Sequence, residues 1–292
     1  MPPDGLPCQV GPLLQALKTR LAPLSETAWL DAQVLLAHIL GVERAFVLAH
    51  PQHTLSADQL ESVNASLQRL LAGEPLPYVL GQWEFYGLTF QLSPAVLIPR
   101  PETEMLVEHA LAWLRQHSGR RRSLDVGTGS GCIAIALAKH VPDLHLLALD
   151  LSAAALKVAR ANASRHQVAQ RIQWLQADLL TPLSTHAVFD LICANPPYIP
   201  TAVLHGLDVH EREPTLALDG GDDGLAVIRP LLRGARHHLR PGGLLLMEIE
   251  ASLGQAAASL AGEAFPEAEV QILPDLAGHD RLLKVQTAHH KA

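Results

Sequence analysis

Cysteine is scarce in this sequence, with three cysteines among 292 residues. Cys8, Cys132 and Cys193 are odd in number and far apart, and no Cys-x-x-Cys pair occurs. Because structural disulfides depend on paired thiols and an oxidising compartment, this pattern favours free thiols in a reducing one. We therefore expect a cytoplasmic protein.

Long apolar runs and an N-terminal targeting segment are also missing. The longest uncharged apolar runs, such as residues 133–138 and 244–247, fall far short of the roughly 20 residues that a membrane-spanning helix needs. The N-terminus has no cationic stretch followed by an apolar segment, as a secretory signal would. We expect no membrane partner.

Positive charge is in deficit, since the formal net charge is −7. A general nucleic-acid binder would carry a basic face. The one dense basic run, residues 120–122, precedes a predicted strand and is interpreted as a solvated linker. Through residue 90 the chain has four Lys and Arg residues against eight Asp and Glu residues. This composition argues against a direct nucleic-acid partner.

Metal-ligand spacing is absent as well, although the chain has sixteen histidines. They are scattered, and none stands beside cysteine or a carboxylate at a convincing ligand spacing. We expect no metal site.

The pattern of the first 75 residues is purely helical. Leucines recur at helical spacing from Leu13 to Leu21 and again around Leu35. Ser25 is expected to cap the second helix, and Ser56 with Gln59 predicts a capping box for a later one. Residues 1–75 are therefore predicted to form a small helical bundle, and its excess of acidic residues favours a role in docking a protein substrate.

Proline and glycine then mark a linker over residues 76–101. We expect a β-hairpin there, with strands over residues 84–90 and 96–99 and a turn at Ser93-Pro94.

From residue 102 to 292, apolar strands alternate with amphipathic helices. Strands are predicted at residues 123–126, 145–149, 172–176, 189–194, 244–249, 270–273 and 281–285. This alternation predicts an α/β fold, a doubly wound and mostly parallel seven-stranded sheet. The last two strands are joined by a short loop and should form an antiparallel pair at one end.

A glycine-rich loop follows the first of these strands. Gly127, Thr128, Gly129, Ser130 and Gly131 lead directly into a predicted helix. Glycines at such a turn let the backbone approach a ligand closely. The spacing is Gly-x-Gly-x-Gly, which differs from the Gly-x-Gly-x-x-Gly of dinucleotide-binding proteins.

Two acids end the next two strands. Asp150 is placed to accept hydrogen bonds from the ribose hydroxyls of a nucleoside. Asp178 could accept from an adenine amino group, and Leu179 could cover the adenine ring. Since the carboxyl ends of parallel strands meet at one sheet edge, the loop and both acids predict a nucleoside site.

The tetrapeptide Asn195-Pro196-Pro197-Tyr198 ends the fourth strand. Two prolines fix the backbone and remove two N–H donors, which leaves carbonyl oxygens free. With the Asn195 side-chain oxygen and the Tyr198 ring, they form a cradle for a planar –NH₂ group. An amide nitrogen is a poor nucleophile, so two acceptors that orient it and stabilise its growing positive charge would assist methyl transfer. We nominate no catalytic acid or base.

Residues 125–131 and 195–198 together resemble the class I amino methyltransferases, whose fold is Rossmann-like with an antiparallel last strand. Further stretches resemble the release-factor glutamine methyltransferases, the HemK/PrmC family, over nearly the whole chain. These are residues 84–87, 97–104, 213–214, 216–218, 241–243 and 275–281.

The resemblance implies methyl transfer from S-adenosylmethionine, with S-adenosylhomocysteine as product, to the glutamine of a Gly-Gly-Gln tripeptide in class 1 peptide chain release factors. The glycine loop, Asp150 and Asn195 would bind the methyl donor. Asn195, Pro196 and Tyr198 would act at the reacting nitrogen, and Asn195 to Tyr198 would bind the substrate amide. Arg100 and Glu102 either shape the substrate mouth or pair with each other. We expect a monomer.

Other functions remain open from the sequence. The substrate could be a glutamine of a ribosomal protein, or an adenine or guanine amino group of a nucleic acid. A non-catalytic nucleoside-binding module is disfavoured by the intact cradle, and a nicotinamide dehydrogenase by the glycine spacing.

Overall fold

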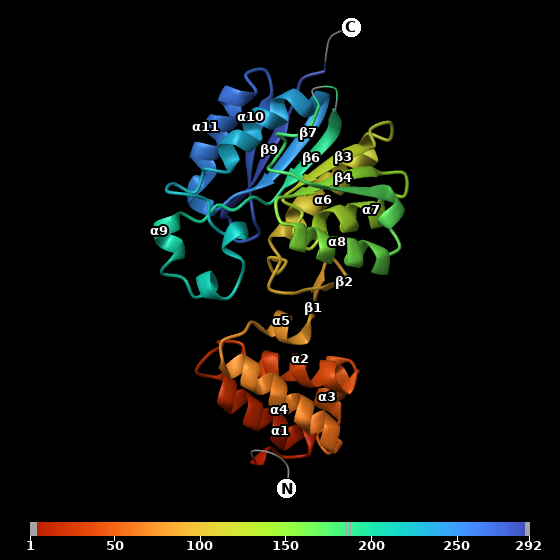
Figure 1. Ribbon diagram of the computed structural model, residues 1–292, viewed down its shortest axis with the longest axis vertical. Helices are drawn as coiled ribbons and strands as arrows, with labels where there is room; N and C mark the ends of the chain where they lie inside the picture. The colour runs from red at the N-terminus through yellow and green to blue at the C-terminus, as the bar shows by residue number, and fades with distance from the viewer. Residues whose placement is uncertain (1–4, 185, 187, 290–292) are drawn as a thin grey trace. The chain divides into compact units, whose positions relative to one another are not determined.

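The structure is a computed structural model that describes residues 5–184, 186 and 188–289. The chain divides into two compact units, Met1–Gln82 and Trp83–Ala292 (Figure 1). Among the described residues, no helix combines the length and the apolar character that crossing a bilayer requires.

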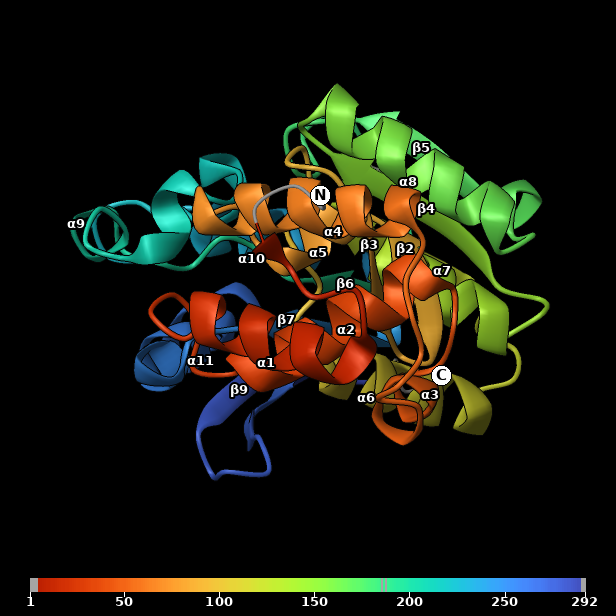
Figure 2. The ribbon, with the colours of Figure 1, turned by 90° about the horizontal axis from the view of Figure 1, so that it is seen from below.

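The N-terminal unit is a helical bundle, as the leucine spacing predicts. Its helices are α1 (Val10–Leu21), α2 (Ala28–Leu40), α3 (Arg44–Ala49), α4 (Ala57–Leu71) and α5 (Leu76–Leu80). Helices α1 and α2 run side by side, as Figure 2 shows, and α4 packs against both. Their apolar stripes form a common core that includes the fully buried Leu13, Leu17, Leu35, Leu36, Val63 and Leu67.

The two predicted helix caps have different outcomes. The capping box is confirmed, since Gln59 N donates to Ser56 Oγ at 3.2 Å and Ser56 N donates to Gln59 Oε1 at 2.8 Å. The Ser25 cap is wrong, because α2 begins at Ala28. Ser25 Oγ instead donates to the Asp31 carboxylate at 2.5 Å, so its hydroxyl is committed to a side chain within the helix.

The linker contains a hairpin, but its strands differ from the prediction. They are β1 (Gln82–Phe85) and β2 (Leu88–Gln91), and residues 96–99 form no strand. The turn lies at Tyr86 and Gly87, whose φ angles are 51° and 68°. Two successive positive φ angles make the tight turn typical of a two-residue hairpin, and this overrides the Ser93-Pro94 signal.

The second unit is built on a seven-stranded sheet in the order β5-β4-β3-β6-β7-β9-β8. The strands are β3 (Arg122–Val126), β4 (His145–Asp150), β5 (Ile172–Gln176), β6 (Phe189–Ala194), β7 (Leu239–Glu248), β8 (Glu269–Pro274) and β9 (Asp280–Gln286). Strands β3 to β7 pair in parallel, whereas β9 is antiparallel to both β7 and β8. The predicted doubly wound sheet with an antiparallel last strand is confirmed.

Helices cover both faces of this sheet, as Figure 1 shows. One face carries α6 (Thr103–Gln116), α7 (Cys132–His140) and α8 (Ala153–Arg165), and the other carries α10 (Ile228–His238) and α11 (Gly254–Ala264). Every residue of the central strand β6 is buried. Coverage on both faces explains why the central strands read as continuous apolar runs.

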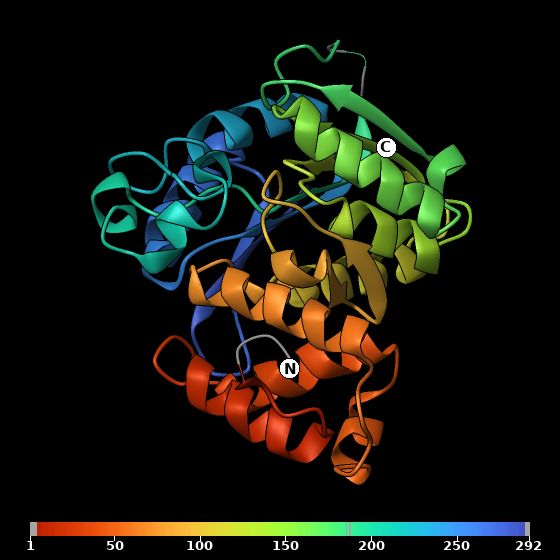
Figure 3. The ribbon, with the colours of Figure 1, turned by 60° about the horizontal axis from the view of Figure 1, so that its bottom comes forward.

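The connection from β6 to α10 is long and mostly irregular. It contains α9 (Thr201–Leu204) and the short 3-10 helices η3 (Asp208–Glu211) and η4 (Thr215–Ala217), and it extends to one side of the sheet, in cyan in Figure 3. Two further 3-10 helices, η2 (Ala169–Arg171) and η5 (Ala251–Leu253), precede β5 and α11. Thr201 Oγ1 donates to Asp219 Oδ1 at 2.7 Å, and this hydrogen bond joins the first and the later part of the connection.

Candidate active site

The glycine loop joins β3 to α7 in the conformation that its sequence predicts. Gly127, Gly129 and Gly131 have φ angles of 74°, 55° and 82°, a region that residues with side chains rarely adopt. At Gly131, an added Cβ would lie 2.9 Å from Ile135 Cδ1 and 3.2 Å from Ala159 Cβ. Gly131 therefore also permits the close packing of α7 on α8.

Asp125 stabilises the conformation of this loop. Its carboxylate accepts a hydrogen bond from Thr128 Oγ1 at 2.6 Å, and the residue is fully buried. Burial raises the pKa of Asp125 to about 7, while hydrogen bonds from Thr128 and the Ala134 backbone act in the opposite direction. Since Asp125 does not line the cavity described below, its contribution is to the shape of the loop.

Asp150, at the end of β4, faces the same loop. Gly129 N donates to Asp150 Oδ2 and Ser152 N donates to Oδ1, each at 2.8 Å. Burial raises the pKa of this carboxyl, and the two backbone hydrogen bonds oppose the rise. Because a carboxylate oxygen can accept two hydrogen bonds, each oxygen keeps an acceptor position for a ligand hydroxyl.

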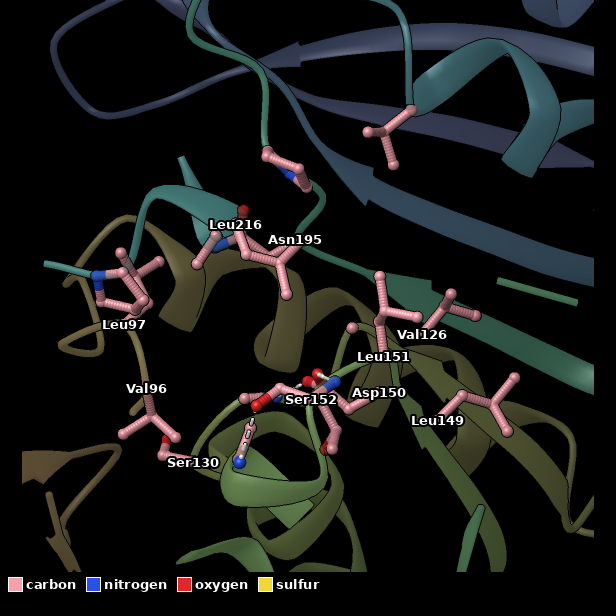
Figure 4. A pocket seen from close by; sticks show the side chains of 18 of the residues that line it. Val96, Leu97, Val126, Ser130, Leu149, Asp150, Leu151, Ser152, Asn195 and Leu216 are labelled. Atoms are coloured by element: carbon pink, nitrogen blue, oxygen red, sulfur yellow. Dashed lines mark hydrogen bonds between the residues drawn. The ribbon is translucent and has the colours of Figure 1, made fainter. Parts of the chain in front are cut away.

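A cavity of about 940 Å³ opens over the carboxyl ends of β3, β4 and β6. Figure 4 shows Ser130, Asp150 and Ser152 on one side of it and Asn195 and Leu216 on the other. The sequence-predicted residues that line it are Arg100, Gly127, Thr128, Gly129, Ser130, Asp150, Asp178, Leu179, Asn195 and Pro197. Its size and its place at the strand ends suit a nucleoside with a second reactant beside it.

Asp178 and Leu179 form the rim beyond β5. Asp178 is exposed and Leu179 is half-buried against the core of the sheet. Leu179 has a φ of 49°, a left-handed conformation that costs a residue with a side chain about 1–2 kcal/mol. Leu179 lines the cavity in this conformation.

The residues of the Asn195–Tyr198 bend are not equivalent in the structure. Asn195 and Pro197 line the cavity, whereas Pro196 is buried and does not line it. Within the described part of the chain, no hydrogen bond ends on the backbone carbonyl oxygens of residues 195–197. The Tyr198 ring packs against the core, and its hydroxyl donates to Glu248 Oε1 at 3.2 Å.

The backbone of this bend is held by two glycines that sequence reasoning missed. A Cβ at Gly220 would lie 2.7 Å from the carbonyl carbon of Tyr198, and one at Gly224 would lie 2.5 Å from the Tyr198 oxygen. Only glycine permits that approach. The Gly-Gly pair at residues 220–221 was a signal that could have been used.

Arg100 pairs with Glu213, and the alternative in which it pairs with Glu102 is wrong. Its guanidinium contacts Glu213 Oε1, and Ile98 N donates to Glu213 Oε2 at 3.0 Å. Glu213 is buried. Its contacts with Arg100 and Ile98 connect the linker that precedes α6 with the β6–α10 connection, next to the cavity. Glu102 is exposed and does not line the cavity.

Sequence reasoning also missed Thr103 and Glu248, which lie beside the bend. Asn195 Nδ2 donates to Thr103 Oγ1 at 3.1 Å, and Thr103 Oγ1 donates to Glu248 Oε2 at 2.6 Å. An acid inside the apolar run of residues 244–249 was the available signal, because a charged residue on a buried strand requires partners.

In the described residues, no group of three or more His, Cys, Asp or Glu side chains is placed to hold a metal ion.

Two family models match the chain. The model described as the PrmC N-terminal domain matches residues 12–81, and that of the methyltransferase small domain matches residues 102–209. Curated relatives include a release factor glutamine methyltransferase of Moorella thermoacetica, 44% identical over 91% of this chain and 94% of the relative. Another release factor glutamine methyltransferase, from Nitratidesulfovibrio vulgaris, is 42% identical over 87% of this chain and 86% of the relative.

Solved structures share the fold of the second unit. A ribosomal protein L11 methylase of Lactobacillus delbrueckii has a TM-score of 0.50 at 22% identity, covering 68% of this chain and 84% of the other. The 16S rRNA N2 G1207 methyltransferase of T. thermophilus, in complex with AdoMet and guanosine, has a TM-score of 0.52 at 20% identity, covering 70% and 49%. At these identities the likeness concerns the fold.

Proposed function

The chain belongs to the release factor glutamine methyltransferase family, and from this premise we propose that the Asn195–Tyr198 bend holds the side-chain amide of a release-factor glutamine for methylation. The enzyme uses S-adenosylmethionine and modifies the amide nitrogen. We further propose that the glutamine is that of the Gly-Gly-Gln tripeptide of class 1 release factors.

The observation that carries this proposal is the set of unused acceptors at the bend. Asn195 Oδ1 takes no hydrogen bond from the described residues, and neither do the carbonyl oxygens of residues 195–197. A primary amide has two N–H donors, so two of these acceptors can hold its nitrogen in a fixed orientation. The same acceptors stabilise the positive charge that the nitrogen gains during alkylation.

The residues of the glycine loop and Asp150 fit the methyl donor. Asp150 keeps acceptor positions for the ribose hydroxyls, and the glycines allow the backbone to approach the donor closely. Asp178 and Leu179 on the rim are assigned to the adenine. When bound, S-adenosylmethionine supplies a methyl group from a positively charged sulfur and leaves as S-adenosylhomocysteine.

No side chain at the bend is assigned as a general base. Burial and the nearby Glu248 carboxylate raise the pKa of Tyr198, so its hydroxyl stays protonated at neutral pH. Placement of the amide and stabilisation of its charge therefore account for the contribution of these residues. After the nitrogen has been alkylated, its proton passes to solvent water, which leaves a neutral methylated amide.

The remaining roles concern the substrate and its surroundings. Arg100, fixed by Glu213, and the exposed Glu102 are assigned to the mouth through which the release-factor loop enters. The N-terminal unit is assigned to docking the body of the release factor. We propose a cytoplasmic monomer that makes no direct contact with nucleic acid or membrane.

A competition among substrates tests the function. The protein is incubated with labelled methyl donor and purified release factors, ribosomal proteins and DNA, and the modified atom is mapped by mass spectrometry. We expect the label on the glutamine amide nitrogen of the release factors. Label on DNA or on ribosomal protein, with none on release factors, would refute the proposal.

A further inference from the structure

A continuous line of hydrogen bonds runs from Asn195 into the sheet. Asn195 Nδ2 donates to Thr103 Oγ1, and Thr103 Oγ1 donates to Glu248 Oε2. Tyr198 donates its hydroxyl proton to the other Glu248 oxygen. Thr103 and Glu248 are each 2% exposed, so water does not compete for these groups. They come from the first turn of α6 and the last residue of β7.

The donor-to-acceptor direction of each hydrogen bond in this line follows from which groups have a proton to donate. An ionised carboxylate accepts hydrogen bonds and donates none, so both hydroxyls beside Glu248 must turn their protons toward it. Thr103 has a single hydroxyl proton, and once that proton is given to Glu248, Thr103 Oγ1 can only accept. Asn195 must then present its –NH₂ group to Thr103, which leaves Oδ1 as the free end of the amide.

This orientation decides whether Asn195 can receive the substrate. The two ends of an asparagine amide have almost the same shape, so packing alone does not distinguish them. In the opposite orientation Asn195 would present N–H donors to the N–H donors of the substrate amide. The acceptor would be lost without any change in the shape of the site.

We propose that Thr103 and Glu248 are positioning residues that fix the orientation of the Asn195 amide, so that its oxygen faces the amide of the substrate glutamine. The inference rests on the proposed function and extends it to a pair of residues outside the bend. Neither residue is required to touch the reacting atoms for this role.

The charge of Glu248 is central to this arrangement. Burial raises the pKa of Glu248, and Glu102 adds to the rise, while hydrogen bonds from Thr103 and Tyr198 and the charge of Arg281 oppose it. A protonated Glu248 could donate to Thr103 and release the Thr103 proton toward Asn195. Turnover should therefore fall on the acid side, as the pH drops through a Glu248 pKa that lies above the ordinary range.

Variants with side chains of nearly equal size separate the effect of hydrogen-bond direction from the effect of side-chain shape. Glu248→Gln keeps the volume but can offer Thr103 either an oxygen or an –NH₂ group, so both orientations of Asn195 become populated. Thr103→Val removes the hydroxyl, whereas Thr103→Ser keeps it and serves as the matched control. For each variant we would measure kcat and KM with release factor, the Kd of S-adenosylmethionine by calorimetry, the pH profile of kcat, and the Tm.

We expect Glu248→Gln and Thr103→Val to lower kcat by about tenfold, the effect of roughly one lost hydrogen bond to a polar group. KM and the donor Kd should change by less than about twofold, and Thr103→Ser should retain most of the wild-type kcat. The acid limb due to Glu248 should disappear from the kcat profile of Glu248→Gln.

Wild-type kcat in both Glu248→Gln and Thr103→Val would overturn the inference. Equal losses of kcat, donor affinity and Tm in Thr103→Val and Thr103→Ser would also overturn it, because they indicate a purely structural role. Failure of the wild-type protein to methylate release factors would instead refute the proposed function, and the inference with it.

Discussion

In the proposed function, Asp150 is the single side chain on which we expect recognition of the methyl donor to depend most. Both of its oxygens are oriented by backbone N–H groups, so their remaining acceptor positions are fixed before a ligand arrives. Asp150→Asn replaces one acceptor with a donor and removes the charge. We expect the Kd of S-adenosylmethionine, measured by calorimetry, to rise by roughly tenfold or more.

The matched control for this change is Asp143→Asn. Asp143 is exposed and pairs with Arg121, away from the cavity. The control should bind the donor like the wild type. A donor Kd for Asp150→Asn within about twofold of the control would contradict the assigned role.

At the residue scale, the sequence predicted the groups that act through local spacing and missed those that act through distant partners. Asp150 and residues 127–130 of the glycine loop stand next to predicted strand ends, and they do line the cavity, whereas Gly131 does not. Glu248 contacts Thr103 from 145 positions away, and Glu213 contacts Arg100 from 113 positions away. Pairings at that separation depend on the tertiary fold, which local patterns do not specify.

At the scale of elements, the turn into α7 must combine a left-handed residue with close helix packing. Gly131→Ala would force a Cβ against Ile135 and Ala159 at a φ of 82°. We expect a loss of about 1–3 kcal/mol in the free energy of unfolding, measured by urea denaturation. Gly119→Ala, whose Cβ would meet nothing within 4 Å, is the control and should be close to neutral.

An equal stability of Gly131→Ala and Gly119→Ala would show that the α7–α8 contact tolerates a methyl group and that the loop is less constrained than described.

Elements with strong periodicity were predicted well, and the hairpin was not. The predicted bounds of β5 and β6 agree with the structure. The hairpin turn at Tyr86-Gly87 carries only one glycine and lies inside an aromatic run that resembles a strand. Apolar residues 96–98 have the composition of a strand but serve as cavity wall and core.

At the scale of the whole molecule, the two compact units suggest a division between docking and chemistry. Every residue that lines the cavity belongs to the second unit. Deletion of residues 1–75 should therefore raise KM for intact release factor by at least about tenfold, since a docking surface is lost. The Kd of S-adenosylmethionine should change little, and this measurement also shows that the shortened chain is folded.

The following result would contradict this division between docking and chemistry. A KM for release factor equal to that of the full chain would remove the docking role. A short peptide that carries the Gly-Gly-Gln segment provides the control, because it lacks the body of the release factor and should lose little activity on deletion.

In the proposed function, the Asn195–Tyr198 bend holds the glutamine amide through free oxygen acceptors. The most direct measurement is the single-turnover rate constant of Asn195→Ala with donor and release factor both saturating. Loss of one of two acceptors should lower this rate constant at least tenfold, or about 1.4 kcal/mol in the activation free energy. A rate constant that falls by less than that would contradict the account.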